Sequence, residues 1–137
     1  MKVILDTNIL LVSISPKSKF RPIFDQLLAG GFDLVISNDI LSEYLEIIGE
    51  KASPTVAANV AELLLNLSHV HLVNVFYNWN LIVHDSSDNK FVDAALAGGC
   101  DYLVTNDKHF KVVQDNDFPK VQIISTIKFM ELIIKSK

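Results

Sequence analysis

Short apolar segments alternate with segments of helical periodicity along the whole chain. The apolar segments are hydrophobic on both faces and indicate buried β-strands, which we expect within residues 2–6, 32–37, 70–76, 101–107 and 121–125. The segments between them carry helix start and stop signals, and we expect helices within residues 20–31, 38–50, 55–68, 86–99 and 126–135. Buried strands separated by helices predict an α/β fold, a three-layer α/β/α sandwich around a parallel sheet of four to five strands.

Length and composition fit one ordinary domain. The chain has 137 residues, half of them hydrophobic, which is enough for a full core. No repeat, low-complexity tract or linker divides it, so we expect a single domain over residues 1–137. The single cysteine, Cys100, excludes an internal disulfide and favours a small core residue in a reducing, cytoplasmic location. No apolar run approaches the roughly 20 residues that span a bilayer, so we expect no membrane partner.

Four carboxylates are expected to meet at one edge of the sheet. Asp6 ends the first strand, in the stretch VILDTNILL, and Asp107 stands at the exit of the fourth. The carboxyl ends of parallel strands share one edge, where ligands of such sheets bind. Two helices leaving that edge add an acid each: Asp88 on the inward face of a first turn, and Glu43 at the border of an apolar face.

Other acids on these helices are weaker candidates. Spacing separates Glu43 from Glu46 only slightly, and Glu43 is preferred because it lies nearer the edge. Asp93 lies well round from the apolar stripe of its helix, and we expect it to be solvated. Taken singly, each acid has an ordinary explanation as a cap, a turn residue or a solvated helix residue. Convergence of four acids on one edge favours a shared function.

Divalent cations are the expected partners of these four acids. Carboxylates at one edge repel one another unless they are protonated or neutralised, and hard cations with oxygen ligands are the usual solution. Mg²⁺ or Mn²⁺ fits best, because no cysteine, histidine or calcium-loop pattern has suitable spacing. The formal net charge of −4 opposes passive binding of nucleic acid. Cations bound to the four acids would cancel that charge where a phosphate must sit.

The sequence resembles the PIN-domain nucleases over essentially its whole length. Within them it is most similar to the short single-domain toxins of toxin–antitoxin systems, relatives of the VapC-like ribonucleases. The matching stretches are VILDTNILL, VISNDILSEYLEII, DSSDNKFVDAALAGGCDYLVTND and the closing strand and helix. The resemblance implies a quartet of catalytic, metal-binding acids, which are Asp6, Glu43, Asp88 and Asp107. It also implies that Asn8 and Thr105 are polar supporting residues around the metal.

The same resemblance implies a reaction and its partners. A metal-activated water would attack in line at phosphorus and hydrolyse RNA, with one or two Mg²⁺ or Mn²⁺ ions bound. The implied partners are RNA and a small antitoxin protein. Relatives often have a proline and further acids where Ser86 and Ser87 follow Asp85. The resemblance leaves open whether Asp85 or Asp93 contacts the metal and favours Asp93 as a supporting residue, because its place is often acidic.

Basic and aromatic side chains near the acids are candidates for RNA contacts. Phe20 and Trp79 have the chemistry to stack on bases, although such aromatics more often belong to a core or an interface. The candidates for phosphate contacts are Lys17, Lys19, Arg21, Lys90 and Lys108, with Lys111 close by. The apolar run at residues 61–67 fits a homodimer face and an ordinary core equally well.

Four histidines complete the candidate features. His69 and His71 lie two apart on one face of a strand, which is compatible with metal binding but lacks a third ligand. His84 and His109 flank the acids and are candidates for substrate contacts. Plain core or surface imidazoles are the commoner explanation for all four.

Three other functions compete with a ribonuclease. A phosphatase working through phospho-Asp6 would need a general acid two residues on, where Asn8 stands. A phospho-acceptor receiver module would need a lysine after the last strand, where Ser125 and Thr126 follow. A catalytically inactive PIN-like binding module is the remaining alternative, although all four acids are present.

Overall fold

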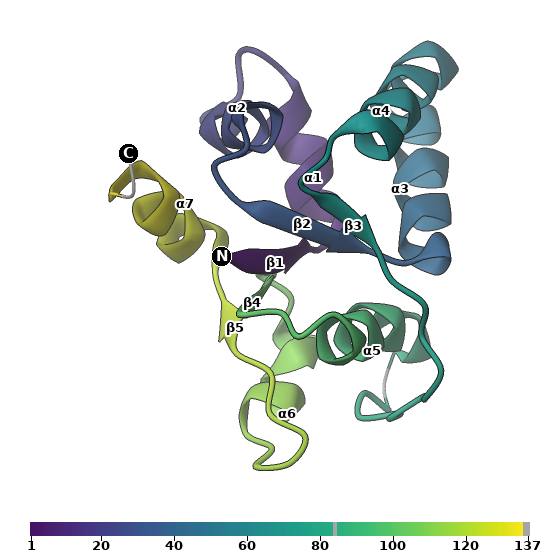
Figure 1. Cartoon of the computed structure of the whole chain (residues 1–137), viewed down its shortest axis with the longest axis vertical. Helices are drawn as coiled ribbons and strands as arrows, with labels where there is room; N and C mark the ends of the chain where they lie inside the picture. Colours follow the sequence, from purple (N-terminus) through teal and green to yellow (C-terminus); the bar gives the residue numbers. More distant parts are fainter. Residues whose placement is uncertain (84, 136–137) are drawn as a thin grey trace.

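The computed structural model describes residues 1–83 and 85–135, and within them five strands form one sheet (Figure 1). All neighbouring strands are parallel, in the order β3-β2-β1-β4-β5, so the first strand lies at the centre. The strands are β1 (Lys2–Leu5), β2 (Asp33–Ile36), β3 (Val70–Leu72), β4 (Tyr102–Val104) and β5 (Ile123–Ile124). The predicted parallel sheet is confirmed.

Helices cover both faces of this sheet. In Figure 1, α1 to α4 lie on one side together with α7, and α5 and α6 lie on the other. Their bounds are α1 (Thr7–Ile14), α2 (Arg21–Ala29), α3 (Asn38–Lys51), α4 (Pro54–Asn66), α5 (Asn89–Ala97), α6 (Lys111–Gln114) and α7 (Thr126–Lys135), with short 3-10 turns η1 (Ser86–Asp88) and η2 (Lys108–Phe110). The three-layer α/β/α prediction is confirmed as well.

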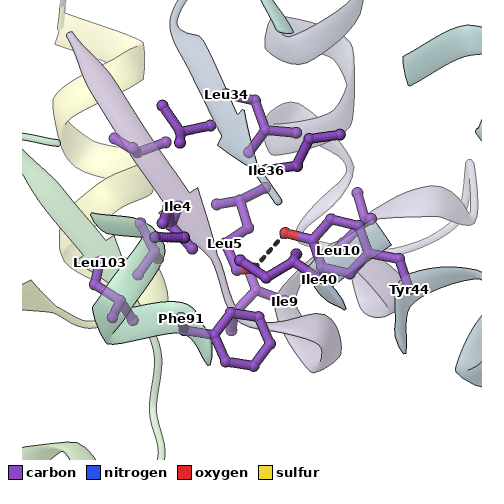
Figure 2. Close-up of a cluster of buried hydrophobic side chains, with 14 of the residues drawn as sticks. Ile4, Leu5, Ile9, Leu10, Leu34, Ile36, Ile40, Tyr44, Phe91 and Leu103 are labelled. Atoms are coloured by element: carbon purple, nitrogen blue, oxygen red, sulfur yellow. Dashed lines mark hydrogen bonds between the residues drawn. The ribbon is translucent and has the colours of Figure 1, made fainter. Parts of the chain in front are cut away.

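The central strand is buried on both faces, which explains its unbroken apolar sequence. Val3, Ile4 and Leu5 are 0 % exposed. Ile4 pairs with Leu103 across the sheet, and Leu5 lies beside the side chains of α1 and α3 (Figure 2). Full burial of such a side chain contributes about 1.5–3 kcal/mol. The strand therefore holds Asp6, which follows it, at a fixed place on the edge of the sheet.

A buried hydroxyl joins α3 to the end of β1. Tyr44 is completely buried and donates a hydrogen bond of 2.5 Å to the carbonyl oxygen of Leu5 (Figure 2). Burial, followed by the nearby charges of Asp6 and Glu43, raises the pKa of Tyr44 well above its ordinary value. The neutral phenol is thus a permanent donor that fixes the carbonyl immediately before Asp6.

We expect Tyr44→Phe to lower the free energy of unfolding by about 1–3 kcal/mol, because the Leu5 carbonyl loses a buried donor. Urea unfolding followed by circular dichroism measures the change. Tyr102→Phe, at a half-buried tyrosine, is the matched control. Equal stability of the Tyr44 variant and the wild type would show that the hydrogen bond has no net effect.

Several predicted elements are shorter than expected. The third strand was expected to reach residue 76 but ends at Leu72, which pairs with Ile36, the last residue of β2. No neighbouring strand extends beyond that pair, so residues 73–83 run as an irregular segment. The helix expected at residues 86–99 begins as the turn η1 and ends at Ala97. The last strand is confined to Ile123–Ile124.

Three further predictions concern Cys100, the homodimer face and the absence of a membrane partner. Cys100 is half-buried against the core, and burial raises the pKa of its thiol to about 12, as expected for an unreactive packing residue. On α4, Leu64 is buried whereas Leu65 is 60 % exposed. The homodimer face stays a prediction. In the part of the chain that the structure describes, no helix has the length and apolarity to cross a membrane.

Candidate active site

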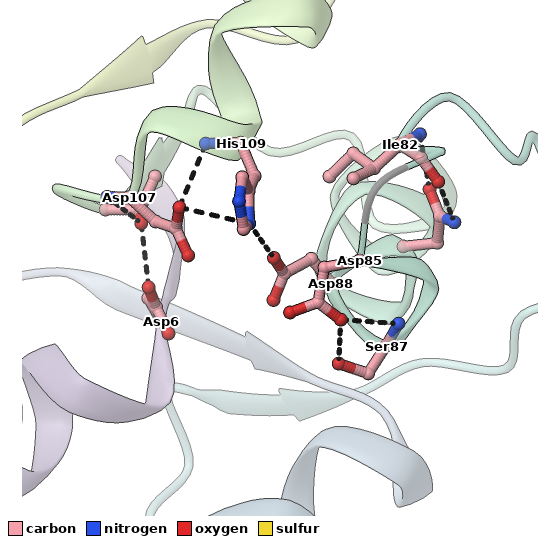
Figure 3. Close-up of polar contacts among 9 residues, drawn as sticks. Asp6, Ile82, Asp85, Ser87, Asp88, Asp107 and His109 are labelled. Carbon is pink, nitrogen blue, oxygen red and sulfur yellow. Dashed lines mark hydrogen bonds and ion pairs between the residues drawn. The ribbon is translucent and has the colours of Figure 1, made fainter.

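Asp6 is held at the centre of the candidate site. Its N–H donates to the carbonyl of Val104 at 3.0 Å, and its carbonyl accepts from the first turn of α1. One carboxylate oxygen accepts a 2.7 Å hydrogen bond from the hydroxyl of Thr105 (Figure 3). The pKa of Asp6 is raised, mainly by burial and further by the charges of Asp107 and Glu43, while the Thr105 hydrogen bond lowers it.

Thr105 connects the two acids that come from opposite ends of the sequence. Its hydroxyl donates to Asp6 and accepts the N–H of Asp107 at 3.0 Å. Asp107 in turn caps η2, because its carboxylate accepts the N–H of His109 at 2.9 Å. The predicted meeting of Asp6 and Asp107 at one edge is confirmed by these contacts. Thr105 lies beside Asp6, and its role as polar support at a metal site stays a prediction.

Glu43 reaches the same edge from α3. One of its carboxylate oxygens accepts a hydrogen bond from the hydroxyl of Thr7, and the other pairs with the ammonium group of Lys90 at 2.6 Å. Both side chains of the ion pair are about three-quarters buried, at 26 % and 22 % exposure. Glu46 is exposed, as the preference for Glu43 required.

Asp88 lies at the junction of η1 and α5 with an oxygen that lacks a good partner. This Oδ2 atom is buried and has no hydrogen bond among the described residues, and Nδ1 of His109 lies 3.5 Å away, in ion-pair range (Figure 3). The same Nδ1 is 3.4 Å from Oδ1 of Asp107. Burial, followed by the charges of Asp85, Asp107 and Asp6, raises the pKa of Asp88 to about 6. A single imidazole thus lies between two carboxylates.

These residues fit a hard divalent cation. The donors are carboxylate oxygens, and one of them, Oδ2 of Asp88, is buried without a hydrogen bond from any residue that the structure describes. One ligand atom each from Asp85, Asp88 and His109 lies within 4.8 Å of the others, a spacing that allows a shared ion. His109 adds a nitrogen donor, although its sequence position predicted only a candidate for substrate contact. Because His109 follows Asp107 by only two residues, the sequence could have indicated it as a further metal ligand.

The structure gives Asp93 and Asp85, the two alternative metal contacts, different surroundings. The prediction that Asp93 is solvated is wrong: it is 5 % exposed, because residues 73–83 cover it. Its Oδ1 accepts the N–H of Trp79 at 3.0 Å. Asp85, the less favoured candidate, lies beside Asp88, and its carboxylate accepts from both the N–H and the hydroxyl of Ser87. These Ser87 hydrogen bonds lower the pKa of Asp85. A supporting role of Asp93 at the metal stays a prediction.

A hollow of about 370 Å³ opens beside Asp6. Asn8, Phe20, Asp107 and Thr126 are among the residues that line it. Asn8 is exposed and lines the same hollow as Asp6, and its supporting role stays a prediction. The predicted stacking residue Phe20 is half-buried at its wall. The hollow has room for a small part of a substrate beside the two acids.

The predicted basic contacts fall into two groups. Lys17, Lys19 and Lys108 are exposed, and the ammonium group of Lys19 lies 5.0 Å from the centre of the Phe20 ring. Arg21 is engaged instead: it pairs with Asp25 at 2.8 Å and donates to the carbonyl of Ile14. Lys90 is likewise paired, with Glu43.

His69, just before β3, and His71, within it, contact different groups. Nε2 of His69 contacts the carbonyl oxygen of Leu27, whereas Nε2 of His71 contacts Asp33 at 3.0 Å. The second contact, as a hydrogen bond and a charge, lowers the pKa of Asp33. His84 lies outside the residues that the structure describes.

We expect Lys90→Met to strengthen Mn²⁺ binding by roughly two- to fivefold, because a cation at Glu43 has to displace the Lys90 ammonium group. Isothermal titration of the metal-free protein measures the dissociation constant. Lys128→Met, at an exposed lysine on α7, is the control for the change in total charge. Weaker binding to the Lys90 variant would mean that the ion pair organises Glu43 rather than competing for it.

Comparison with solved structures shows the same fold in nucleic-acid-related proteins. VapBC2 from Rickettsia felis, bound to a DNA fragment from its promoter, is similar with a TM-score of 0.62 and 20 % identity, over 91 % of this chain and 98 % of that one. VapC20 of Mycobacterium tuberculosis, a Sarcin-Ricin loop cleaving toxin, gives 0.58 and 16 %, over 80 % and 92 %. The PIN domain endonuclease Utp24 gives 0.54 and 21 %, over 90 % and 84 %.

Comparison with curated protein sequences finds no match. The family model described as PIN domain, in contrast, matches residues 2–109, which is more than three-quarters of the chain. That range contains all four acids of the quartet and Thr105. The protein therefore belongs to the PIN-domain family.

Proposed function

We propose that this protein is a divalent-metal-dependent endoribonuclease that hydrolyses RNA phosphodiester bonds with water. The observation that carries the proposal is the convergence of the four acids at one edge of the sheet, where burial and mutual charge raise the pKa of Asp6 and Asp88. Such an arrangement is unfavourable without cations and becomes favourable with them. The proposed catalytic and metal-binding residues are Asp6, Glu43, Asp88 and Asp107.

Each residue has a distinct part in the proposed site. A bound Mg²⁺ or Mn²⁺ ion, one or two in number, would supply an activated water and offset the charge of the scissile phosphate. Thr105 holds Asp6 and the Asp107 backbone in register through its hydroxyl group. Lys90 pairs with Glu43 and has the charge to meet a phosphate when a cation displaces it. Lys17, Lys19 and Lys108 are exposed cations for the RNA backbone.

The proposal extends to a cellular role as the toxin of a toxin–antitoxin pair. It is supported by the likeness to VapC20, described as a toxin that cleaves the Sarcin-Ricin loop, and to VapBC complexes bound to DNA. A small antitoxin protein and an RNA substrate are then the partners, and the cytoplasm is the location. Arrested growth on expression, relieved by a neighbouring antitoxin gene, is the expected result. Normal growth of a host that lacks any antitoxin would contradict the role.

The activity itself is tested with purified protein and mixed RNA. We expect cleavage with Mg²⁺ or Mn²⁺ and none with EDTA, because the acids alone repel phosphate. A small phosphomonoester serves as the second substrate. Its hydrolysis without RNA cleavage would favour the phosphatase that Asn8 argues against, and no reaction in either assay would favour an inactive binding module.

A further inference from the structure

A pocket with aromatic walls lies between residues 74–79, residues 118–120 and α5, and its lining includes none of the four acids of the quartet. Its volume is about 590 Å³, and Tyr77, Trp79 and Phe118 contribute three of its walls. The ring centres of Tyr77 and Trp79 are 4.6 Å apart, and those of Trp79 and Phe118 are 6.0 Å apart, both edge to face. Tyr77 is 64 % and Phe118 81 % exposed. Neighbouring rings exposed in this way mark a binding surface.

The carboxylate of Asp93 also lines this aromatic pocket. Asp93 is 5 % exposed, and its one hydrogen bond among the described residues comes from the N–H of Trp79. The described ion pairs do not include it. Burial raises its pKa, as expected where no cation compensates the loss of water. Removing a charge from water without a partner is unfavourable, so this carboxylate is complementary to a cation that enters the pocket.

The described charged residues around the pocket do not supply a cation that pairs with Asp93. Lys120 belongs to the lining, but its ammonium group donates to the carbonyl of Gln114 at 2.9 Å. Asp115 and Asp117 are exposed in the loop that carries Phe118. The surroundings are therefore more negative than positive. A polyanionic backbone would be repelled there, whereas a cationic side chain would be attracted.

We propose that this aromatic pocket binds an arginine side chain of a protein partner. A guanidinium group stacks on aromatic faces and forms paired hydrogen bonds with a carboxylate, which matches the walls and Asp93 together. The only arginine of this chain, Arg21, is held on α2 by Asp25 and the Ile14 carbonyl. A second copy of the chain therefore has no free arginine to offer, and the partner is a different protein. The pocket includes none of the four proposed catalytic acids, so the proposal does not rest on the nuclease activity.

Trp79 allows a direct test, because it is the only tryptophan of the chain. Its fluorescence is titrated in EDTA with the peptide acetyl-Gly-Arg-Gly-amide. The same peptide with citrulline is the neutral, nearly isosteric control. We expect a saturable change with the arginine peptide and none with the citrulline peptide. Asp93→Asn, which keeps an acceptor for the Trp79 N–H, is expected to weaken binding about tenfold or more.

Tyr77→Ala gives a second variant at an exposed position, where folding is not at stake, and should also weaken binding by about threefold or more. Circular dichroism checks that both variants are folded. Equal responses to the two peptides, no saturable response, or unchanged binding by both folded variants would overturn the proposal. A response to oligouridylate alone would overturn it as well and would identify the pocket as a base-stacking site.

Discussion

Asp6→Asn is expected to lower the rate of RNA cleavage by at least about 100-fold at saturating Mn²⁺. Asp6 lies between Thr105 and the other acids, so the substitution removes a charge that a cation would need while keeping the side chain's size. Single-turnover cleavage of a labelled RNA measures the loss. Because the buried carboxylate is replaced by a neutral amide, the variant should fold at least as stably as the wild type in EDTA.

Glu131→Gln is the matched control for this experiment. Glu131 is exposed on α7 and has no part in the proposed site, and its substitution changes the total charge by the same amount. Full activity of this variant beside an inactive Asp6→Asn variant would attribute the loss to the site. Cleavage by the Asp6 variant at the wild-type rate would contradict the proposed reaction.

Asp88→Asn is expected to stabilise the metal-free protein near pH 7.5 by about 1–3 kcal/mol and to have little effect near pH 4. The pKa of Asp88 is about 6 in the folded protein against an ordinary value of 3.8. Within this window the folded protein keeps a proton that the unfolded chain has lost. The contribution of Asp88 to the free energy of unfolding therefore decreases as the pH rises from about 4 to 6.

Urea unfolding of both proteins in EDTA, at several values between these limits, measures the difference. Comparing variant with wild type removes the contribution of Asp33, whose lowered pKa acts in the opposite direction. Excess Mn²⁺ near pH 7.5 should stabilise the wild type more than the variant, because the charge then has a partner. A difference in the free energy of unfolding that stays the same from about pH 4 to about pH 7.5 and does not change with Mn²⁺ would contradict both the raised pKa of Asp88 and its role as a metal ligand.

The layers of the fold were predictable because strands such as VILD are apolar on both faces and can only lie in a covered parallel sheet. The ends of strands were less predictable. The apolar run from Val70 to Phe76 has strand character throughout, yet its pairing ends where β2 ends at Ile36. Strand length depends on the neighbour as well as on the residues of the strand itself.

The positions of the site residues were likewise predictable only where they follow from the sheet topology or from a regular helix. Topology predicted that Asp6 and Asp107 meet at one edge, and helix periodicity predicted Glu43 on the side of α3 that faces it. Asp88 was expected in the first turn of a helix but lies at the end of η1, just before α5. The burial of Asp93 depends on an irregular segment folding over α5, and no local pattern encodes that path. The position of His109 between two carboxylates depends equally on where η2 begins relative to η1.

The pairing of β1 with β4 has a consequence for synthesis of the chain. The N–H of Asp6 donates to the carbonyl oxygen of Val104, and its carboxylate accepts from the hydroxyl of Thr105, both of which lie about 99 positions later in the chain. A ribosome-bound chain that ends before these residues has the first acid but neither Thr105 nor Asp107. The proposed nuclease would thus stay harmless to the ribosome and messenger that produce it until the last quarter of the protein has emerged and docked.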